Sequence, residues 1–430
     1  MSRVLNLAYG KNGASIRLRE GFRYTVLEAK GAPALPDRDA AIRHALDSPI
    51  GQMPLYELAQ GKRSAAISVC DITRPAPNPI VLPPVLERLE KAGIERQNIV
   101  ILIATGLHRA ATPAEIREIV GDEIAALYRV ENHDARDRAS HRFLGVTASG
   151  TPAWVDERFV SADLRITLGF IEPHLMAGFS GGRKLVVPGL AAQETIKVIH
   201  SPRFMREASA VEGSIARNPL HRELVELAAM AGHQFMVDVA LSRDRAIAGV
   251  FAGDPVEAHR AGVQFVSNAL LQNVDRPVDA AITTAAGYPL DLTYYQCIKG
   301  VTAASHIVRD GGRILIAGAC TEGCGGPEFS EMLGWHPDPQ SFLAALTATG
   351  ATVTVDQWQL EKLALVASRA EILYCVPGLA PALRAQLWGS SFDTPQQAVD
   401  ALLTGLPPGA DVAIIPEGPY VLAKVSGAAS

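Results

Sequence analysis

Histidine and lysine side chains gather in two short segments that otherwise read as tight turns. The first, residues 105–108, ends in His108; the second, residues 172–184, contains His174 and ends in Lys184, with His200 following. Imidazole titrates near neutral pH, so His108 and His174 could act as a pair of general bases, one on each side of a substrate carbon. Each could instead be a hydrogen-bonded polar residue with no part in catalysis.

The end of the second segment combines glycines with two adjacent cations, in the order Ser180, Gly181, Gly182, Arg183 and Lys184. Backbone N–H groups and Arg183 could cradle a phosphate or a nucleotide there. The spacing fits neither the P-loop nor the GxGxxG pattern, and a flexible surface turn is the alternative. The charge of Arg183 disfavours the ammonium form of Lys184, which is one route to a nucleophilic amine, although an exposed lysine without that role is the alternative.

Apolar runs alternate with amphipathic stretches around these segments. We predict strands at residues 65–70, 98–106 and 164–171, and helices at residues 79–93 and after Thr112, where Glu115 can close a capping box. This alternation is typical of parallel strands joined by crossover helices. His108 and His174 would then follow the carboxyl ends of strands, the edge at which open α/β sheets bind ligands. A helical pattern from Glu194 places His200 at a helix C-terminus, before a Ser-Pro pair.

Asp71 and Arg74 lie directly after the first of these strands, in the sequence Asp-Ile-Thr-Arg-Pro. They should face the same crevice as the two histidines. The planar guanidinium of Arg74 could bind a carboxylate or a phosphate through two parallel hydrogen bonds. The alternative is an aspartate that caps the turn and an arginine that pairs with it.

A second α/β block begins near residue 278. We predict strands at residues 279–285, 313–319, 371–376 and 411–416, and helices near residues 292–309, 338–349 and 357–369. The chain is therefore predicted to form two Rossmann-like α/β domains, residues 1–273 and 274–430, with the active site in the cleft between them. Lys299 could bind a carboxylate there, or could be a solvated lysine on a helix face. The polar cluster to which it belongs is Tyr294, Tyr295, Gln296 and Lys299.

The composition favours an enzyme that acts on small molecules in the cytoplasm. The chain has 430 residues, 48% of them hydrophobic and 20% charged, with a net charge of −5. Its cations are scattered, so no surface for nucleic acid or for an anionic membrane is indicated. No signal peptide and no long apolar run is present. The five cysteines contain no CxxC pair, which argues against disulfides and structural zinc, although Cys320 and Cys324 leave a metal site as an alternative.

Six motifs, taken together, resemble the nickel-dependent lactate racemase family, in a match that runs from Tyr9 to beyond Trp358. They are residues 71–75, 105–108, 172–174, 180–184, 199–202 and 295–300. The resemblance implies a nickel pincer nucleotide, a nicotinic-acid-derived mononucleotide with two sulfur donors, covalently attached to Lys184. It also implies that His200 completes a roughly square-planar Ni(II) site. The implied cofactor contacts are Asp71, Thr73, Arg74, Trp358 and, near the phosphate, Ser180, Gly181, Gly182 and Arg183.

The same resemblance implies a racemase or epimerase of 2-hydroxy acids such as lactate. One of His108 and His174 takes the hydroxyl proton while the C2 hydride moves to the cofactor, and the other returns a proton after the planar keto acid rotates. The implied substrate contacts are Arg74 and Lys299 at the carboxylate, and Gln296 with Tyr295 or Tyr294. The implied partners are a small 2-hydroxy acid and the cofactor-assembly enzymes. Two alternatives stay open, a nicotinamide-dependent 2-hydroxyacid dehydrogenase and a non-catalytic nickel or cofactor carrier.

Overall fold

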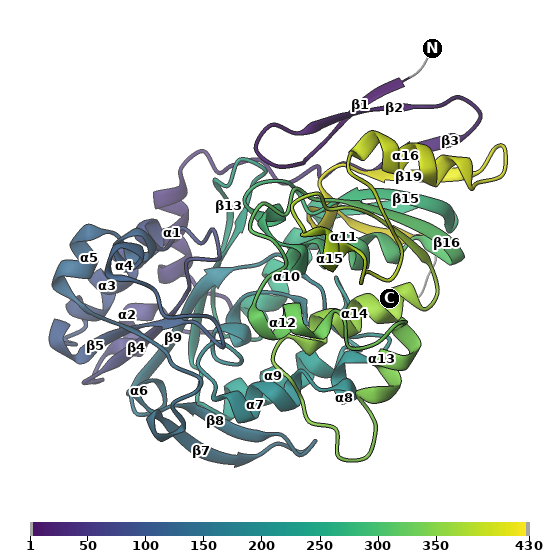
Figure 1. Ribbon diagram of the computed structural model, residues 1–430. Coiled ribbons are helices and arrows are strands. Elements are labelled where there is room, and N and C mark those ends of the chain that lie inside the picture. Colours follow the sequence, from purple (N-terminus) through teal and green to yellow (C-terminus); the bar gives the residue numbers. More distant parts are fainter. Residues whose placement is uncertain (1–2, 427–430) are drawn as a thin grey trace. The chain divides into compact units, whose positions relative to one another are not determined.

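The structure, a computed structural model, describes residues 3–426, and the chain forms two compact α/β units (Figure 1). Unit 2 comprises residues 31–199 and 214–269. Unit 1 comprises the described residues up to Lys30, the segment His200–Gly213 and the described residues from Leu270 onward. The domains predicted as residues 1–273 and 274–430 are continuous pieces of chain. Each unit is instead assembled from separate segments, because strand pairing and side-chain contacts join residues that lie far apart in the sequence.

Unit 2 is built on a six-stranded sheet in the order β13-β12-β9-β4-β5-β6. Neighbouring strands are parallel, except that β13 is antiparallel to β12. All six residues of β4 are buried, as expected for a parallel strand covered on both faces. The strands predicted at residues 65–70, 98–106 and 164–171 are confirmed. The bounds are β4 Ala65–Cys70, β5 Ile99–Ala104, β6 Arg129–Asn132, β9 Leu164–Phe170, β12 Phe235–Leu241 and β13 Ile247–Gly253.

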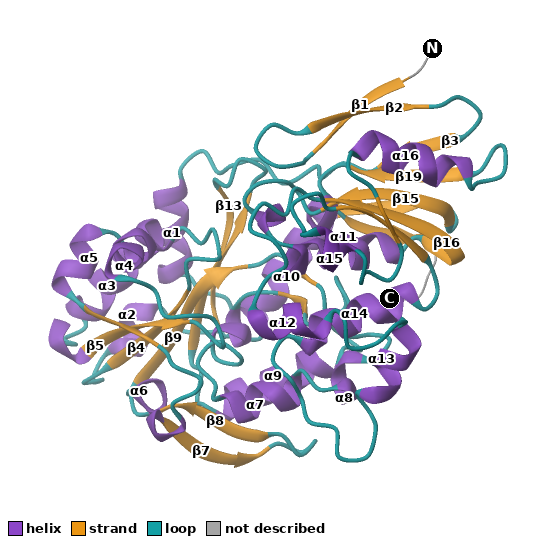
Figure 2. Ribbon diagram, viewed as in Figure 1, coloured by secondary structure: helices purple, strands orange, loops and turns teal. Residues whose placement is uncertain are grey.

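Helices cover this sheet, and strands β4 and β9 contact α3, against which α1, α2 and α4 pack (Figure 2). The predicted capping box is present at the start of α4, where Thr112 and Glu115 bond each other's backbone. Unit 2 also has two short hairpins, β7 with β8 and β10 with β11. The bounds are α1 Arg38–Asp47, α2 Leu55–Ala59, α3 Asn78–Lys91, α4 Pro113–Val120, α5 Asp122–Leu127, α6 Glu157–Val160, α7 Gln193–Ile199, α9 Pro219–Met230, α10 Glu257–Leu270, β7 His141–Val146, β8 Pro152–Asp156, β10 Pro173–His174 and β11 Gly178–Phe179.

Unit 1 is built on a second six-stranded sheet, all parallel, in the order β18-β17-β16-β15-β19-β3. Strand β3 pairs with β19, which is why the N-terminal residues belong to this unit. The four strands predicted for the second block are confirmed. The bounds of the sheet strands are β3 Arg23–Val26, β15 Val278–Thr284, β16 Val308–Ala317, β17 Glu371–Cys375, β18 Ser390–Ser391 and β19 Asp411–Ile415.

The remaining elements of unit 1 include the hairpin of β1 and β2 and the parallel pair of β14 and β20. The predicted helices near residues 292–309, 338–349 and 357–369 correspond to α11, α13 and α14. The bounds are α8 Pro202–Met205, α11 Tyr294–Ser305, α12 Pro327–Met332, α13 Pro339–Ala345, α14 Gln357–Ala367, α15 Pro381–Arg384, α16 Pro395–Thr404, β1 Arg3–Leu7, β2 Ala14–Leu18, β14 Leu271–Val274 and β20 Leu422–Val425.

The strand order reverses at β4 in unit 2 and at β15 in unit 1. The strands that follow β4 in the chain lie on opposite sides of it, β5 on one side and β9 on the other. The loops after these three strands therefore diverge at the carboxyl edge of the sheet, the position at which doubly wound sheets bind ligands. Among residues 3–426, no helix is long and apolar enough to cross a membrane.

Candidate active site

His108 and Asp71 come from the loops after β5 and β4 and form a hydrogen-bonded pair. The distance from His108 Nδ1 to Asp71 Oδ2 is 2.6 Å, and the imidazole is 56% exposed while the carboxylate is 7% exposed. Thr73 donates to the other oxygen, Asp71 Oδ1, from its hydroxyl at 2.7 Å and from its backbone N–H at 3.3 Å. Burial raises the pKa of Asp71, but the bonds from His108 and Thr73 outweigh it, so the pKa is lowered. The dyad therefore presents an oriented imidazole to solvent.

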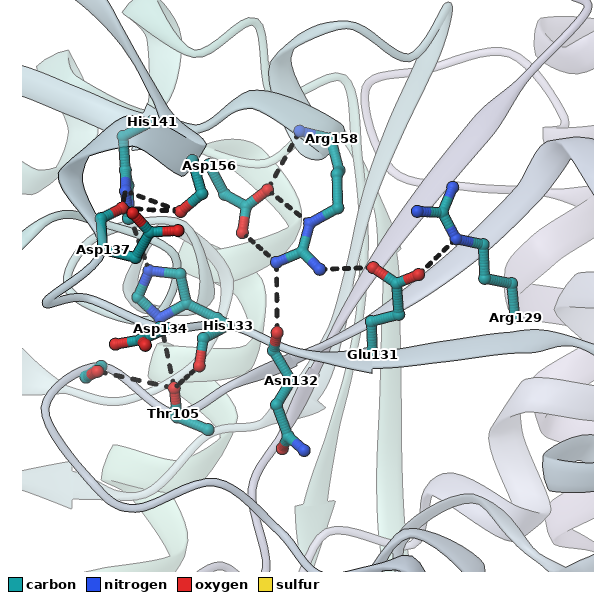
Figure 3. A network of polar contacts seen from close by, with 12 residues as sticks. Thr105, Arg129, Glu131, Asn132, His133, Asp134, Asp137, His141, Asp156 and Arg158 are labelled. Atoms are coloured by element: carbon teal, nitrogen blue, oxygen red, sulfur yellow. Dashed lines mark hydrogen bonds and ion pairs between the residues drawn. The ribbon is translucent and has the colours of Figure 1, made fainter.

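A buried polar network anchors the start of the His108 loop (Figure 3). Thr105 accepts the backbone N–H of His108 on its carbonyl at 2.9 Å. Its hydroxyl donates to the His133 carbonyl at 2.8 Å. His133 Nε2 lies 2.9 Å from His141 Nε2. Burial lowers the pKa of His133 to about 3, so the imidazole of His133 is uncharged at neutral pH. The network fixes the turn that ends in His108.

His174 and Lys184 lie side by side in the region that follows β9. His174 ends β10, and its Nδ1 accepts hydrogen bonds from the backbone N–H groups of Met176 at 3.4 Å and Ala177 at 3.3 Å. Its Nε2 lies 3.1 Å from Lys184 Nζ. The side chains of His174 and Lys184 are both half-buried. The structure therefore brings together two of the residues that the sequence singled out.

Asp238, on β12, holds the glycine turn before Lys184. Its Oδ2 accepts the N–H of Gly182 at 2.7 Å, and Gly181 has a φ of +83°, which L side chains rarely adopt. A Cβ on Gly181 would lie 2.1 Å from Asp238 Oδ2, so only glycine fits. Burial raises the pKa of Asp238 to about 7. Sequence reasoning missed this residue, although a carboxylate in the apolar run Phe-Met-Val-Asp-Val-Ala-Leu was a signal.

Arg183 turns into the protein instead of toward a ligand. Its guanidinium donates to four backbone carbonyls and lies 2.6 Å from His259 Nε2. Burial lowers the pKa of Arg183 to about 9. The Ser180 side chain also binds the protein's own backbone, since its hydroxyl donates to the Phe170 carbonyl at 2.8 Å. These two side chains therefore shape the loop, and a phosphate contact of residues 180–183 would fall to the backbone. The four carbonyls are those of Ala177, Phe179, Ser180 and Gly181.

Arg74 lies in the same loop as Asp71, as the sequence predicts. Its Nη1 is 3.4 Å from Glu172 Oε1, and both side chains are partly buried, at 30% and 24% exposed. This contact places a cation and a carboxylate together at the carboxyl edge of the sheet. The loops after β4, β5 and β9 thus carry Asp71, Arg74, His108, His174 and Lys184.

His200 and Trp358 are brought together in unit 1. Their ring centroids are 4.4 Å apart with planes inclined by 37°, and both residues are buried, at 9% and 6% exposed. Trp358 lies on α14, and His200 follows the last residue of α7, as the helical pattern predicts. Among residues 3–426, no three His, Cys, Asp or Glu side chains are grouped so that they could hold a metal ion.

The predicted polar cluster of α11 separates into core and surface residues. Tyr294 is 1% exposed and its ring contacts Phe329 and Tyr374, so it belongs to the core and is not a candidate substrate contact. Tyr295, Gln296 and Lys299 are half-buried. The Gln296 amide oxygen is buried without a hydrogen-bond partner, a feature that a bound ligand could satisfy.

Comparison of this sequence with known proteins points to one family. Residues 9–213 match the lactate racemase N-terminal domain, and residues 274–423 match the lactate racemase C-terminal domain. The lactate racemase of Thermoanaerobacterium thermosaccharolyticum is 34% identical over 365 residues, which cover 84% of this chain and 85% of that protein. The lactate racemase of Lactiplantibacillus plantarum is 35% identical over 385 residues, which cover 89% of this chain and 90% of that protein.

Solved structures agree with this assignment. The lactate racemase apoprotein from T. thermosaccharolyticum matches with a TM-score of 0.91 at 30% identity, covering 98% of this chain and all of that chain. A Thermotoga maritima protein with a TM-score of 0.67 and 16% identity shares the fold alone. The fold and the matched domains define an isomerase of the racemase class. The chain belongs to the lactate racemase family.

Proposed function

We propose that the protein racemises lactate, or a closely related 2-hydroxy acid, with a nickel pincer nucleotide attached to Lys184. The observation that carries the proposal is the 3.1 Å contact between His174 Nε2 and Lys184 Nζ, which puts a candidate acid/base group beside the candidate attachment point. Similarity to two lactate racemases over most of the chain supports the choice of substrate. The cytoplasmic location and the need for cofactor-assembly enzymes are part of the same proposal.

The side chains present fit such a cofactor. Lys184 is a half-buried amine at the carboxyl edge of a sheet, directly after a turn whose two glycines have positive φ. His200 offers an imidazole, a donor that suits nickel, and the ring of Trp358 limits its orientation. The remaining nickel donors would come from the cofactor. Asp71, Thr73, Arg74 and the backbone of residues 180–183 would complete its surroundings.

The chain's own residues would bind the substrate and move its proton. When bound, the cofactor would take up the hydrogen at C2 with its electron pair and return it. Arg74 and Lys299 would hold the carboxylate, and Tyr295 and Gln296 would contact the rest of the substrate. His108 and His174 would be the acid/base pair at the 2-hydroxyl. A small or apolar group at C3 is favoured, because Leu175 and Met176, which directly follow His174, are apolar.

The proposal is tested by attachment of the cofactor. We expect protein co-produced with the assembly enzymes and nickel to carry a nucleotide-sized adduct on the Lys184 peptide, detected by mass spectrometry. Lys184→Ala should carry none, because no amine remains to form the bond. Lys197→Ala, which removes another lysine of unit 2, is the matched control and should be loaded as the wild type is. An unmodified Lys184 in cells that load a known family member would contradict the proposal.

Activity distinguishes the alternatives that the sequence left open. The loaded protein should convert each lactate enantiomer into the racemate, and chiral chromatography measures this conversion. Formation of NADH from lactate would instead support a dehydrogenase. Loading without any turnover of a panel of 2-hydroxy acids would support a carrier.

A further inference from the structure

We propose that Asn218 is a positioning residue for His174, the second histidine of the acid/base pair. The inference deepens the proposed function and rests on it for the role of His174. Asn218 is fully buried and lies directly before α9, 44 residues after His174 in the chain. It acts through the backbone of the turn that follows this histidine.

The side-chain amide of Asn218 uses its oxygen and its nitrogen for different tasks. Its Oδ1 accepts the backbone N–H of His221 at 3.1 Å, which caps α9. Its Nδ2 donates to the carbonyls of Met176 at 2.9 Å and Ser214 at 3.2 Å. A backbone N–H only donates and a carbonyl only accepts, so these three partners fix which way the amide points. Neither ionised aspartate nor serine can make all three bonds, because aspartate has no hydrogen to donate and serine has one.

The bond to Met176 reaches His174 through one rigid peptide group. The carbonyl of Met176 and the N–H of Ala177 belong to the same planar trans peptide unit and point in opposite directions. The amide of Asn218 holds the carbonyl end of this unit, and its N–H end lies 3.3 Å from His174 Nδ1. A tilt of the peptide group would therefore move the donor that contacts the imidazole.

The same amide joins this turn to the chain before α9. The turn continues into Gly178, whose φ is +78° and where a Cβ would lie 1.9 Å from the Ser214 carbonyl oxygen. That carbonyl is the second acceptor of Asn218. The two stretches of backbone therefore pack directly against each other, and Asn218 bonds one carbonyl on each side. All of these residues belong to unit 2.

A cap of α9 that has no influence on His174 is the alternative role of Asn218, and Asn218→Ser separates the two. Serine caps a helix about as well as asparagine, but its single hydroxyl cannot hold two carbonyls. The protein is produced without cofactor and with ¹⁵N-labelled histidine rings. Its NMR spectrum is recorded at a pH of about 8.5, where ordinary imidazole is neutral. His174→Gln and His108→Gln variants assign the signals of the two histidines.

We expect Asn218→Ser to shift the Nδ1 signal of His174, because the peptide group that contacts this nitrogen loses its anchor. The His108 signals should stay in place, since that histidine lies on another loop. Asp37→Ser alters the exposed cap of α1, another helix of unit 2, and is the matched control that should shift neither histidine. A His174 signal that does not move in Asn218→Ser would overturn the proposal and leave Asn218 as a helix cap alone.

Asn218→Asp is a second variant, of nearly the same size as the wild type. An ionised carboxylate still caps α9 but has no hydrogen to donate, so the carbonyls of Met176 and Ser214 lose their donor. We expect the His174 Nδ1 signal to shift here as well. This variant decides the question if Asn218→Ser does not fold, and a wild-type His174 signal in it would contradict the proposal.

The loaded enzyme gives an independent readout. Asn218→Ser should keep the adduct on Lys184 and the KM for lactate, because the attachment point and the proposed carboxylate contacts are not altered. Its kcat should fall by roughly 10²-fold, the cost of misplacing a catalytic group by about 1 Å. An unchanged kcat would count against the positioning of His174 by Asn218.

The spectra do not depend on racemase activity. A shifted His174 signal in Asn218→Ser, in a protein whose wild type never acquires the adduct, would sink the proposed function and leave the contact between Asn218 and the His174 turn standing. An unshifted signal, in a protein whose loaded wild type racemises lactate, would do the reverse.

Discussion

Three residues with candidate chemistry, His108, His200 and Lys184, are each positioned by a second side chain. Asp71 binds His108 at 2.6 Å, and the ring of Trp358 lies 4.4 Å from that of His200. Asp238 holds the turn that precedes Lys184. Such partners restrict rotamers and tautomers, which is what preorganises a site. Their effect should therefore appear in the geometry of the site as well as in its rate.

Arg183 is the residue for which stability, and not ligand binding, should respond to substitution. Arg183→Lys keeps the charge but replaces a planar fork with one ammonium, which cannot reach the four carbonyls. We expect the free energy of unfolding of unit 2 to fall by about 3 kcal/mol, measured by urea denaturation. Arg117→Lys, at a side chain that is 55% exposed, should change it little. An unchanged free energy of unfolding in Arg183→Lys would mean that the bonds to the four carbonyls do not stabilise unit 2. A direct phosphate contact would then again be the better interpretation of Arg183.

At the scale of elements, the segment His200–Gly213 is fastened to helices of unit 1. Lys362, on α14, donates to the carbonyls of Met205 at 2.7 Å and Ala210 at 2.8 Å. Arg206 pairs with Glu361 at 2.9 Å, also on α14. Glu212 accepts a hydrogen bond from the Thr302 hydroxyl, on α11, at 2.7 Å. Its other carboxylate oxygen lies 2.7 Å from Nε2 of His306, the residue that follows α11. These contacts hold the segment that begins with His200 on the helix that carries Trp358.

Lys362→Met should loosen that segment without removing any candidate ligand. Two buried carbonyls lose their charged donor, a cost of about 2 kcal/mol in the local opening free energy. Amide hydrogen exchange in residues 203–212 should therefore become roughly 30-fold faster, as read by mass spectrometry. Lys91→Met removes an exposed lysine of unit 2, whose side chain is 66% exposed, and should leave this exchange unchanged. Equal exchange in both variants would mean that Lys362 does not fasten the segment.

At the scale of the whole molecule, buried histidines concentrate in unit 2. Burial lowers the pKa of His133 and His221 to about 3 and of His233 to about 4, and lowers the pKa of His259 well below 6.5. Below pH 6.5 these histidines become protonated in the unfolded chain but stay unprotonated in the folded state. Acid therefore favours the unfolded state, and the free energy of unfolding falls as the pH falls. Asp238 acts in the opposite sense, because its pKa is raised to about 7 and the folded state binds its proton first.

The stability of unit 2 should therefore decrease in acid. The four histidines bind protons in the unfolded state, and their effect is larger than the opposite effect of the single aspartate. We expect its unfolding free energy to fall by up to about 4 kcal/mol per pH unit between pH 6.5 and 4. Trp154 reports on this unit, because the other tryptophans, Trp335, Trp358 and Trp388, belong to unit 1. A variant with these three replaced by Phe follows unit 2 by fluorescence in urea. A midpoint that does not change between pH 7.5 and 5 would contradict the prediction.

The sequence by itself determined seven of the twelve strands in the two six-stranded sheets, namely β4, β5, β9, β15, β16, β17 and β19, and the order of the loops that carry chemistry. Parallel strands buried on both faces are continuous apolar runs, and the box of Thr112 and Glu115 marks a helix start within four residues. His108 and His174 could therefore be assigned to strand ends, and the motifs together indicated the family. These features depend on neighbours in the chain, which is why a linear pattern reveals them.

Only the tertiary structure decided how those residues are held. It assigned Tyr294 to the core, turned Arg183 inward, and placed residues 200–213 with unit 1. The partners that do this are distant in the chain: Asp71 and His108 are 37 residues apart, Gly182 and Asp238 are 56 apart, and Met205 and Lys362 are 157 apart. No local pattern records such contacts. They form because buried polar groups must find partners wherever the fold brings them together.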